Sequence, residues 1–301
     1  MTGPTFFVVG AGRSGTTSLH QYLGAHPDIF VTGTKSPDYF VSDLPMPDWE
    51  VPVARRMARD WVSTRAEYDA LFAGVTTEQA VGDVSPVYLQ ARSAAHSIAA
   101  AFPNARIVAI LRDPVERAHA HWLGRRRDGI ERRADFRSVI EGELARGLPD
   151  EIAFGSYLGI GRYHHFLCDY TNLFPPDRLR VYLFDDLRAD EGGLLADLFG
   201  FLGVEASFSP DTSIHYGQTG MIRNPLARAV WTRSVTLRTA LRPYLPAAIR
   251  HRALPLAARS GLGRPTLGPE LRSRMLEAVR DDIERLQVLI DRDLSAWLAV
   301  P

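Results

Sequence analysis

Short apolar runs alternate with stretches of helical periodicity along the first two thirds of the chain. Runs of largely apolar residues, typical of buried strands, occur at residues 6–9, 29–32, 80–84, 106–111 and 179–184. Amphipathic or alanine-rich stretches predict helices at residues 16–23, 91–101, 114–127, 162–173 and 191–202. Strands that alternate with helices favour βαβ units, so we predict an α/β fold with a central parallel β-sheet flanked by helices.

The rest of the chain is less regular. Residues 46–73 are polar and aromatic and predict a mixture of loop and helix. Residues 212–269 contain nine arginines and no acidic residue, and they are interleaved with leucines and Trp231. A mixed-charge helix is expected at residues 269–290. We treat the whole chain, 1–301, as one domain in which the basic, partly helical segment 212–269 covers the binding cleft.

Composition narrows the class of protein. The chain is 46% hydrophobic and 23% charged, as in ordinary globular proteins, and 35 basic residues balance 35 acidic ones. A nucleic-acid binder would be more basic, so no nucleic-acid partner is expected. Cys168 is the only cysteine, which rules out an intrachain disulfide and a thiolate metal cage. No run approaches the roughly 20 apolar residues of a membrane span, and no signal peptide is evident, so we expect a cytoplasmic protein.

A glycine-rich loop, Gly10-x-Gly12-x-x-Gly15, follows the first strand and precedes the first helix. Such loops aim backbone N–H groups at phosphate oxygens. The acidic residue that a dinucleotide-binding domain needs after the second strand is missing, and so is the lysine that a Walker A loop carries after its last glycine. Arg13 and the hydroxyls of residues 16–18 are suited to a tetrahedral anion without a metal. A glycine turn required only for packing remains an alternative.

A second motif, Arg112-Asp113-Pro114, follows the most apolar strand. Asp113 is placed to cap the next helix, Pro114 suits its first position, and Glu116 completes a capping-box pattern. Arg112 then faces the edge where α/β sheets bind ligands, and a guanidinium suits a phosphate. An ion pair with a nearby carboxylate is the alternative for Arg112.

Together the two motifs resemble those of the nucleotide-dependent sulfotransferases, most closely the bacterial and heparan-sulfate-type branch. The first motif is similar to the 5′-phosphosulfate loop of that family, and the second to its 3′-phosphate motif. Further similar segments are His26-Pro27-Asp28-Ile29, Lys35-Ser36-Pro37-Asp38-Tyr39-Phe40, Gly82-Asp83-Val84-Ser85-Pro86-Val87-Tyr88 and Phe201-Leu202-Gly203-Val204. The resemblance runs in order through residues 5–205 and, more loosely, through the C-terminal helix.

The resemblance implies a P-loop-like domain that moves a sulfuryl group from 3′-phosphoadenylyl sulfate (PAPS) to a hydroxyl or amine, in line and without a metal. It implies that the 5′-phosphosulfate is held by Arg13 and by the loop residues Ser14, Gly15, Thr16, Thr17 and Ser18. It also implies that Arg112 holds the 3′-phosphate and that Lys35 stabilises the charge of the transferring group. Further nucleotide contacts are expected from a later glycine-containing loop, here Gly217, Gly220 and Arg223.

Two departures from the family pattern affect the site. The family glutamate that takes the acceptor's proton is replaced by Ser36, so the catalytic base must be different. Asp38 is our first candidate because of its reach, and Asp83 is the second, with a structural role in binding loop amides as the alternative for Asp83. The family serine of the 3′-phosphate motif is replaced by Ala120, and we interpret its neighbour His119 as a surface residue rather than a substitute.

The acceptor is not defined by any motif. A small-molecule acceptor of a bacterial pathway, such as a secondary metabolite or a lipid-linked sugar, is preferred, and the arginine-rich segment also suits an anionic or amphiphilic partner or an interfacial contact. Two other classes of function stay open: a nucleotide-binding homologue without catalysis, and a P-loop kinase-like phosphotransferase.

Overall fold

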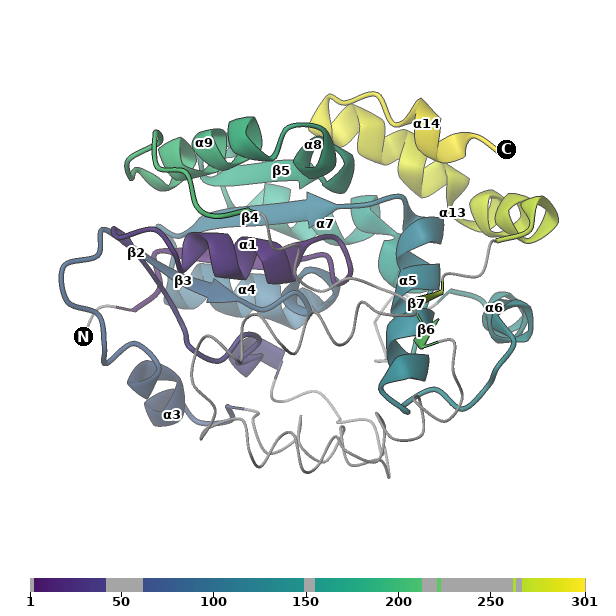
Figure 1. The fold of residues 1–301 in the computed structure, drawn as a ribbon, viewed down its shortest axis with the longest axis horizontal. Helices are drawn as coiled ribbons and strands as arrows, with labels where there is room; N and C mark the ends of the chain where they lie inside the picture. The colour runs from purple at the N-terminus through teal and green to yellow at the C-terminus, as the bar shows by residue number, and fades with distance from the viewer. Residues whose placement is uncertain are drawn as a thin grey trace.

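The computed structural model describes residues 3–41, 62–148, 155–212 and 267–300, together with the backbone of 221–222 and 262–263. Five parallel strands form its central sheet, in the order β2-β3-β1-β4-β5 (Figure 1). The strands are β1 (Phe6–Gly10), β2 (Ile29–Val31), β3 (Ala80–Val84), β4 (Arg106–Leu111) and β5 (Leu179–Leu183). The α/β fold with a central parallel sheet is therefore confirmed.

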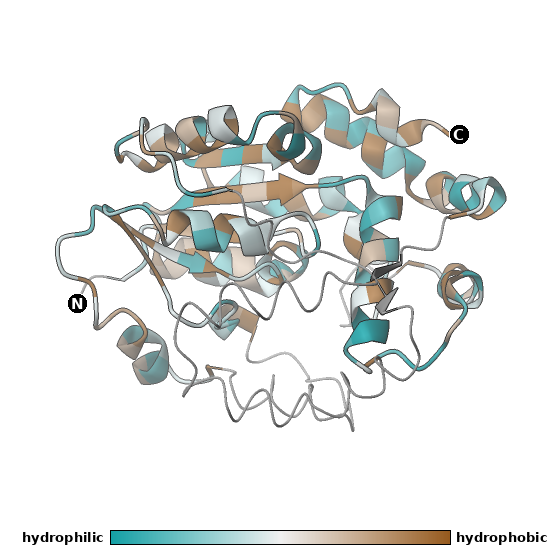
Figure 2. Cartoon of the chain, viewed as in Figure 1, coloured by the Kyte–Doolittle hydropathy of each residue, from teal (hydrophilic) through white to brown (hydrophobic). Residues whose placement is uncertain are grey.

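The middle of the sheet is buried on both faces. Every residue of β1 and β3 is buried, and β4 is exposed only in part at Arg106. Strand β4 is mostly brown, the colour of hydrophobic residues, in Figure 2. Side chains on adjacent positions of a strand point to opposite faces, so Phe7 and Ile107 enter one core while Phe6 and Val108 enter the other. Continuous apolar runs are required here because both faces exclude water.

Helices cover both faces of the sheet. The core that contains Phe6 is closed by α1 (Thr16–Leu23) and α9 (Glu191–Leu202). The core that contains Phe7 is closed by α4 (Arg92–Ala101), α7 (Tyr163–Leu173) and α13 (Pro269–Ile290). The two layers are visible in Figure 1, where α1 and α4 lie on opposite sides of the strands. The strands and helices expected at residues 6–202 by their apolar pattern, and the helix 269–290, are thus present, with ends that differ by at most one residue.

Helix α5 (Pro114–Arg127) continues directly from the end of β4. The Asp113 carboxylate accepts hydrogen bonds from the backbone N–H groups of Val115 (2.8 Å) and Glu116 (3.0 Å), which confirms the expected cap. Its other oxygen accepts from Arg272 of α13 at 2.7 Å, in a largely buried ion pair. The C-terminal helix is thereby attached to the start of α5.

Several elements were not expected from the sequence. Helix α6 (Phe136–Arg146) follows α5, with Asp135 as its N-cap. The predicted strand 179–184 ends at Leu183, because Phe184 begins the short helix α8 (Phe184–Ala189). Short helices and turns carry a weak periodic signal, so apolar patterning does not separate them from loop or from a neighbouring strand.

The remaining elements are short. They are α3 (Arg65–Ala70), α14 (Ser295–Leu298), the 3₁₀ turns η1 (Tyr39–Val41), η2 (Tyr88–Gln90), η3 (Gly159–Gly161) and η4 (Pro176–Arg178), and the antiparallel pair β6 (Met221–Ile222) and β7 (Leu262–Gly263). Strand β6 packs against α5. Most of segment 212–269 lies outside the described residues. Among those that are described, no helix is both long and apolar enough to cross a membrane.

Candidate active site

The turn between β1 and α1 directs backbone N–H groups toward the carboxyl edge of the sheet. Gly15 has a left-handed conformation with φ 97° and immediately precedes α1. A Cβ at Gly15 would lie 3.0 Å from a methyl carbon of Leu187, so both the conformation and the space require glycine. The N–H groups of the first helical turn have no carbonyl partner within the helix, and a helix start of this kind favours an anion.

The hydroxyls that follow the loop do not share one direction. Successive helical residues are rotated by about 100° around the axis, so Thr16, Thr17 and Ser18 project differently. Thr16 and Ser18 are buried, and Thr17 is partly exposed. Contacts from Thr16, Thr17 and Ser18 to one anion therefore stay a prediction, and the backbone N–H groups of the helix start are the feature that these residues share.

Arg13 extends from the loop toward α5. A Cβ built on Gly124 of α5 would lie 2.0 Å from an Nη atom of Arg13, so the guanidinium fills the space above this glycine. Burial, followed by the nearby charge of Arg127, lowers the pKa of Arg13 to about 10, and Arg117 and Arg125 act in the same direction. The nearby carboxylate of Asp128 opposes this shift. This arginine group, Arg13, Arg117, Arg125 and Arg127, has an excess of positive charge beside the loop.

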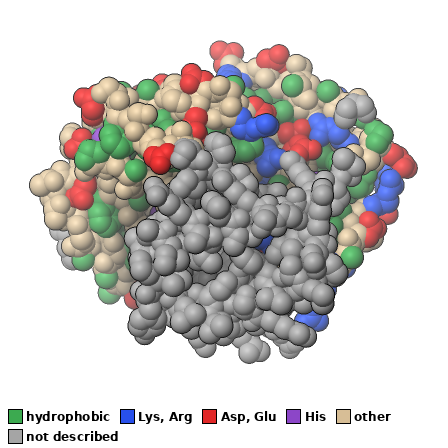
Figure 3. Space-filling model, viewed as in Figure 1, with side chains coloured by type: hydrophobic (Ala, Val, Ile, Leu, Met, Phe, Trp, Pro, Cys, Tyr) green, Lys and Arg blue, Asp and Glu red, His purple; other side chains and the backbone are tan. Residues whose placement is uncertain are grey.

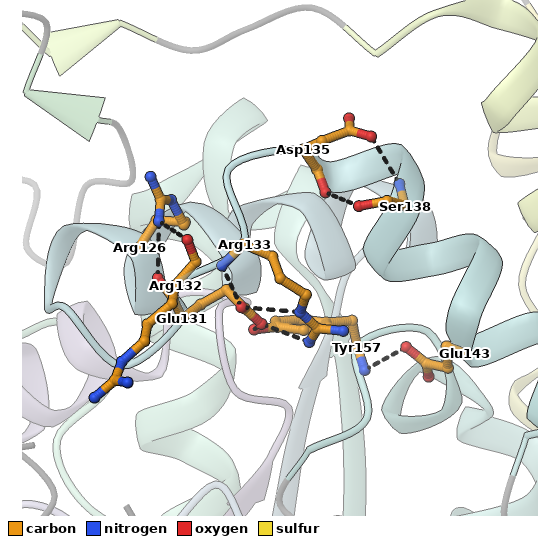
Figure 4. Close-up of polar contacts among 8 residues, drawn as sticks. All are labelled: Arg126, Glu131, Arg132, Arg133, Asp135, Ser138, Glu143 and Tyr157. Atoms are coloured by element: carbon orange, nitrogen blue, oxygen red, sulfur yellow. Dashed lines mark hydrogen bonds and ion pairs between the residues drawn. The ribbon is translucent and has the colours of Figure 1, made fainter. Parts of the chain in front are cut away.

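Tyr157 closes one side of the arginine group. Its ring lies 5.5 Å from the Arg125 guanidinium carbon, and its backbone oxygen accepts a hydrogen bond from buried Arg117. The Tyr157 hydroxyl donates to Glu131 (2.9 Å), and its N–H donates to Glu143 (2.8 Å), as Figure 4 shows. The loop and helix after α5 therefore hold Tyr157 in place against the cations.

Arg112 lies at the end of β4 and contacts the loop directly. Its Nη1 donates to the backbone oxygen of Arg13 at 3.3 Å, and its Nη2 lies 3.5 Å from a carboxylate oxygen of Glu116. The guanidinium carbon stacks over the ring of Phe184 at 4.9 Å from the centroid. The Arg112 carbonyl accepts from the Tyr163 hydroxyl at 2.8 Å. Arg112 thus forms an ion pair with Glu116, which was the alternative interpretation of this residue. The same contacts orient its guanidinium beside the loop.

Lys35 and Asp38 lie together after β2. Burial, strengthened by Arg13 and opposed by Asp38, lowers the pKa of Lys35 to about 8. Burial, and then the charge of Asp83, raises the pKa of Asp38 to about 7. The Oδ1 atom of Asp38 is buried and has no hydrogen-bond partner among the described residues. The pair therefore combines a cation and a carboxylate that both titrate near neutral pH, next to Arg13.

Asp83 is placed differently from Asp38. It is the fourth residue of β3 and is completely buried. Its Oδ2 accepts hydrogen bonds from the hydroxyls of Tyr68 (2.8 Å) and Tyr88 (2.9 Å), and its Oδ1 accepts from Ser85 (2.6 Å). Burial raises the pKa of Asp83 to about 6, and the three hydroxyls oppose that rise. Both of its oxygens are engaged within the protein.

One interpretation from the sequence is wrong. His119 is not a surface residue: it is 3% exposed and packs against the rings of Trp122 (5.9 Å) and Phe136 (4.9 Å). Ala120, which replaces the family serine, is buried as well. The unexpected helix α6 supplies Phe136 and thereby covers this part of α5.

Other residues near the site were not singled out from the sequence. Arg117, His121 and Arg125 follow one another at four-residue spacing and so share a face of α5. Burial and the neighbouring guanidiniums hold the pKa of His121 well below its ordinary value. The spacing was a usable signal for this cluster, whereas nothing in the sequence linked Tyr68 to Asp83. Gly217, Gly220 and Arg223 lie outside the described residues.

The surface carries charged side chains of both signs, whereas the arginine group has an excess of positive charge. In the space-filling view, Lys and Arg side chains stand among Asp and Glu side chains (Figure 3). Arg292 and Asp186 form one surface ion pair, with 2.8 Å between Nη2 and Oδ1. Within the described ranges, no three His, Cys, Asp or Glu side chains converge as metal ligands.

Comparison with known sequences agrees with this arrangement. A sequence model described as the sulfotransferase family matches residues 4–209. Human bifunctional heparan sulfate N-deacetylase/N-sulfotransferase 2 is 24% identical over 205 residues, which is 67% of this chain and 22% of that protein. Mouse heparan sulfate glucosamine 3-O-sulfotransferase 3B1 is 25% identical over 219 residues, 72% of this chain and 50% of that protein. The chain thus spans half or less of the length of these relatives.

Comparison with solved structures extends the likeness to the whole chain. A sulfotransferase from Alicyclobacillus acidocaldarius is 28% identical with a TM-score of 0.75, and the match covers 99% of this chain and 100% of that one. A mouse sulfotransferase complexed with PAP shares the fold at 13% identity, with a TM-score of 0.50 over 99% of this chain and 89% of that one. On the family match, the relatives and this structural likeness, the chain belongs to the sulfotransferase family of enzymes.

Proposed function

We propose that this protein moves a sulfuryl group from PAPS to a hydroxyl or amine of a small-molecule or glycolipid-like acceptor, without a metal. The observation that carries the proposal is the Lys35–Asp38 pair, which lies beside Arg13 and has an unpartnered, buried carboxylate oxygen among the described residues. A general base works best when its pKa is close to the working pH, and the pKa of Asp38 is raised to about 7.

The donor half of the site is suited to a molecule with two anionic ends. The helix start after Gly15 and the arginine group offer N–H groups and positive charge for a phosphosulfate. Arg112 offers a planar guanidinium for the 3′-phosphate, and its contact with the Arg13 carbonyl links the two positions. The mouse relative described above was crystallised with PAP, which supports the same type of nucleotide here.

In the proposed reaction, Asp38 takes the proton of the acceptor group as that group attacks sulfur. The new bond joins the acceptor oxygen or nitrogen to sulfur, and the bond between sulfur and the 5′-phosphate oxygen breaks. The electron pair of that bond stays on the phosphate, which leaves as adenosine 3′,5′-bisphosphate. Lys35 and Arg13 stabilise the negative charge on the sulfuryl and phosphate oxygens, and fixed cations in a dry site do this without reorganisation.

The acceptor proposal rests on less specific features. Two of the relatives carry heparan sulfate in their names, which concerns those proteins and their longer chains. In this chain the sequence of segment 212–269 contains nine arginines, interleaved leucines and no acidic residue. This composition supports an anionic or amphiphilic small molecule as the acceptor, and a cytoplasmic, bacterial setting belongs to the same proposal.

Calorimetric titration tests the donor. We expect adenosine 3′,5′-bisphosphate to bind in the micromolar range, far more tightly than ADP and without magnesium. Transfer from radiolabelled PAPS to a panel of phenols, alcohols and amines, with EDTA present, then tests catalysis. Preference for ATP with magnesium would favour the kinase-like alternative. Nucleotide binding with no transfer, and no slow hydrolysis of PAPS, would favour the non-catalytic one.

A further inference from the structure

The buried carboxylate of Asp83 is the centre of a hydroxyl network that reaches the segment carrying Asp38. Tyr68 comes from α3, Tyr88 from η2, and Ser85 follows β3, yet all three hydroxyls donate to this one carboxylate within 2.9 Å. Burial keeps the pKa values of both tyrosines above the ordinary range, so they remain donors. Three separate parts of the chain are therefore joined at Asp83.

Two of these three residues, Ser85 and Tyr68, also contact the segment of residues 36–39. Ser85 Oγ, which donates to Asp83, accepts a hydrogen bond from the backbone N–H of Asp38 at 3.2 Å. The ring of Tyr68 stacks on Tyr39 with centroids 4.6 Å apart and planes 18° apart. The residue that precedes Asp38 by two, Ser36, donates its N–H to the Val84 carbonyl at 3.1 Å.

The backbone of this segment needs such support. Ser36 and Asp38 have φ values of 61° and 54°, in the left-handed region that residues other than glycine seldom adopt. Conformations of this kind persist where surrounding contacts fix them, and they gather at functional sites. Here the contacts that fix them lead to Asp83 and to the end of β3.

We propose that Asp83 is a positioning residue, which acts through Ser85 and Tyr68 to hold Asp38 in the conformation that presents its carboxylate to the acceptor. The proposal rests on the function proposed above, in which Asp38 is the base. Asp83 does not act as the base itself, because it is fully buried and both of its oxygens already accept hydrogen bonds.

The groups around Asp38 also shift the pKa of its carboxyl group by electrostatic interaction. The charge of Asp83 raises the pKa of Asp38, whereas Lys35 and the Ser85 hydroxyl lower it. Tyr88 also lies within electrostatic reach of Asp38 and stays neutral. Removing the Asp83 charge and removing the Ser85 hydroxyl should therefore move the pKa of Asp38 in opposite directions. Loss of packing alone would not produce that pair of shifts.

The experiment compares Asp83→Asn, Ser85→Ala and Ser85→Thr with the wild type. We expect Ser85→Ala to lower kcat roughly 10- to 100-fold, as a misplaced catalytic group does, and Ser85→Thr, which keeps the hydroxyl, to restore most of it. Affinity for adenosine 3′,5′-bisphosphate should change less than about twofold in each. Tyr182→Phe is the matched control, because Tyr182 belongs to the opposite core and its hydroxyl donates to the exposed Asp197 at 2.7 Å.

Carboxyl ¹³C NMR titration supplies a readout that does not depend on turnover. We expect the pKa of Asp38 to fall in Asp83→Asn and to rise in Ser85→Ala, with the acid limb of the pH–rate profile moving the same way. Shifts in the same direction, or a wild-type kcat in Ser85→Ala, would overturn the positioning role. Failure of the wild type to use PAPS would overturn the proposed function instead, and the titration would still decide whether Asp83 positions Asp38.

Discussion

The donor and acceptor halves of the site that we propose differ in how they are built. The donor half consists of the turn 10–18 and Arg112, where the fold of two adjacent strands, β1 and β4, places a local motif. The acceptor half consists of Lys35 and Asp38, which depend on contacts from β3, α3 and η2. A short motif can therefore encode anion binding, whereas the placement of a base needs several distant segments.

The halves also differ in charge. Cations dominate the donor half, and the pKa of Arg13 falls to about 10 because it is buried among other arginines. In the acceptor half, burial is the main cause of both shifts: it raises the pKa of Asp38 to about 7, with help from the charge of Asp83, and lowers the pKa of Lys35 to about 8. The first arrangement suits binding of a fixed charge, and the second suits movement of a proton.

The largest effect should come from removing the base. We expect Asp38→Asn to reduce kcat by roughly 10²- to 10⁴-fold, because general base catalysis contributes on that order. Affinity for adenosine 3′,5′-bisphosphate should stay within a fewfold of wild type, since the donor half is unaltered. Asp177→Asn, on an exposed turn, is the control for loss of a carboxylate. Parallel losses of turnover and donor affinity would remove the distinction between the halves.

Removing Arg112 should act on the other half. A hydrogen bond to a charged group contributes about 1.5–3 kcal/mol. Arg112→Ala should therefore weaken the binding of adenosine 3′,5′-bisphosphate by roughly 10- to 150-fold. The affinity for ADP, which has no 3′-phosphate, should change little. Calorimetry with both nucleotides measures the difference, with Arg188→Ala at an exposed position as the control. An equal loss for the two nucleotides would contradict a 3′-phosphate contact.

The pH dependence of kcat/KM reports on the acceptor half. Activity should rise with pH as Asp38 loses its proton near pH 7, and it should fall again as Lys35 loses its proton near pH 8. On each side of the optimum, kcat/KM should fall roughly tenfold per pH unit beyond the pKa of the titrating group. Affinity for the donor product, measured over the same range, should vary less. A flat profile between pH 6 and 9 would exclude this pair as the titrating groups.

The smallest effect should come from displacing Arg13 indirectly. Gly124→Ala would set a methyl group 2.0 Å from the present position of an Arg13 Nη atom, so the guanidinium must move. We expect a loss of about 1 kcal/mol in donor affinity, or roughly fivefold. Gly200→Ala on α9 is the matched control, because nothing lies within 4 Å of the added carbon. If Gly124→Ala binds the nucleotide like Gly200→Ala, Arg13 does not contact it from this position.

Much of the fold was determined by local sequence patterns. The strand β4 and the cap at Asp113 follow from an apolar run and from an acidic residue before a proline, and both were predicted closely. The turn at Gly15 was also indicated by the glycine-rich pattern between a strand and a helix, and its left-handed backbone favours glycine. Such features depend on residues a few positions apart, so the sequence displays them directly.

Only the tertiary structure decided which polar groups meet. His119 is buried because α6, a helix with a weak periodic signal, supplies Phe136 against it. Asp38 differs from Asp83 in availability because the hydroxyls of Tyr68, Tyr88 and Ser85 occupy both oxygens of Asp83, whereas Oδ1 of Asp38 has no hydrogen-bond partner among the described residues. A carboxylate's pKa and reach depend on burial and on charges brought from distant segments, and no local pattern carries that information.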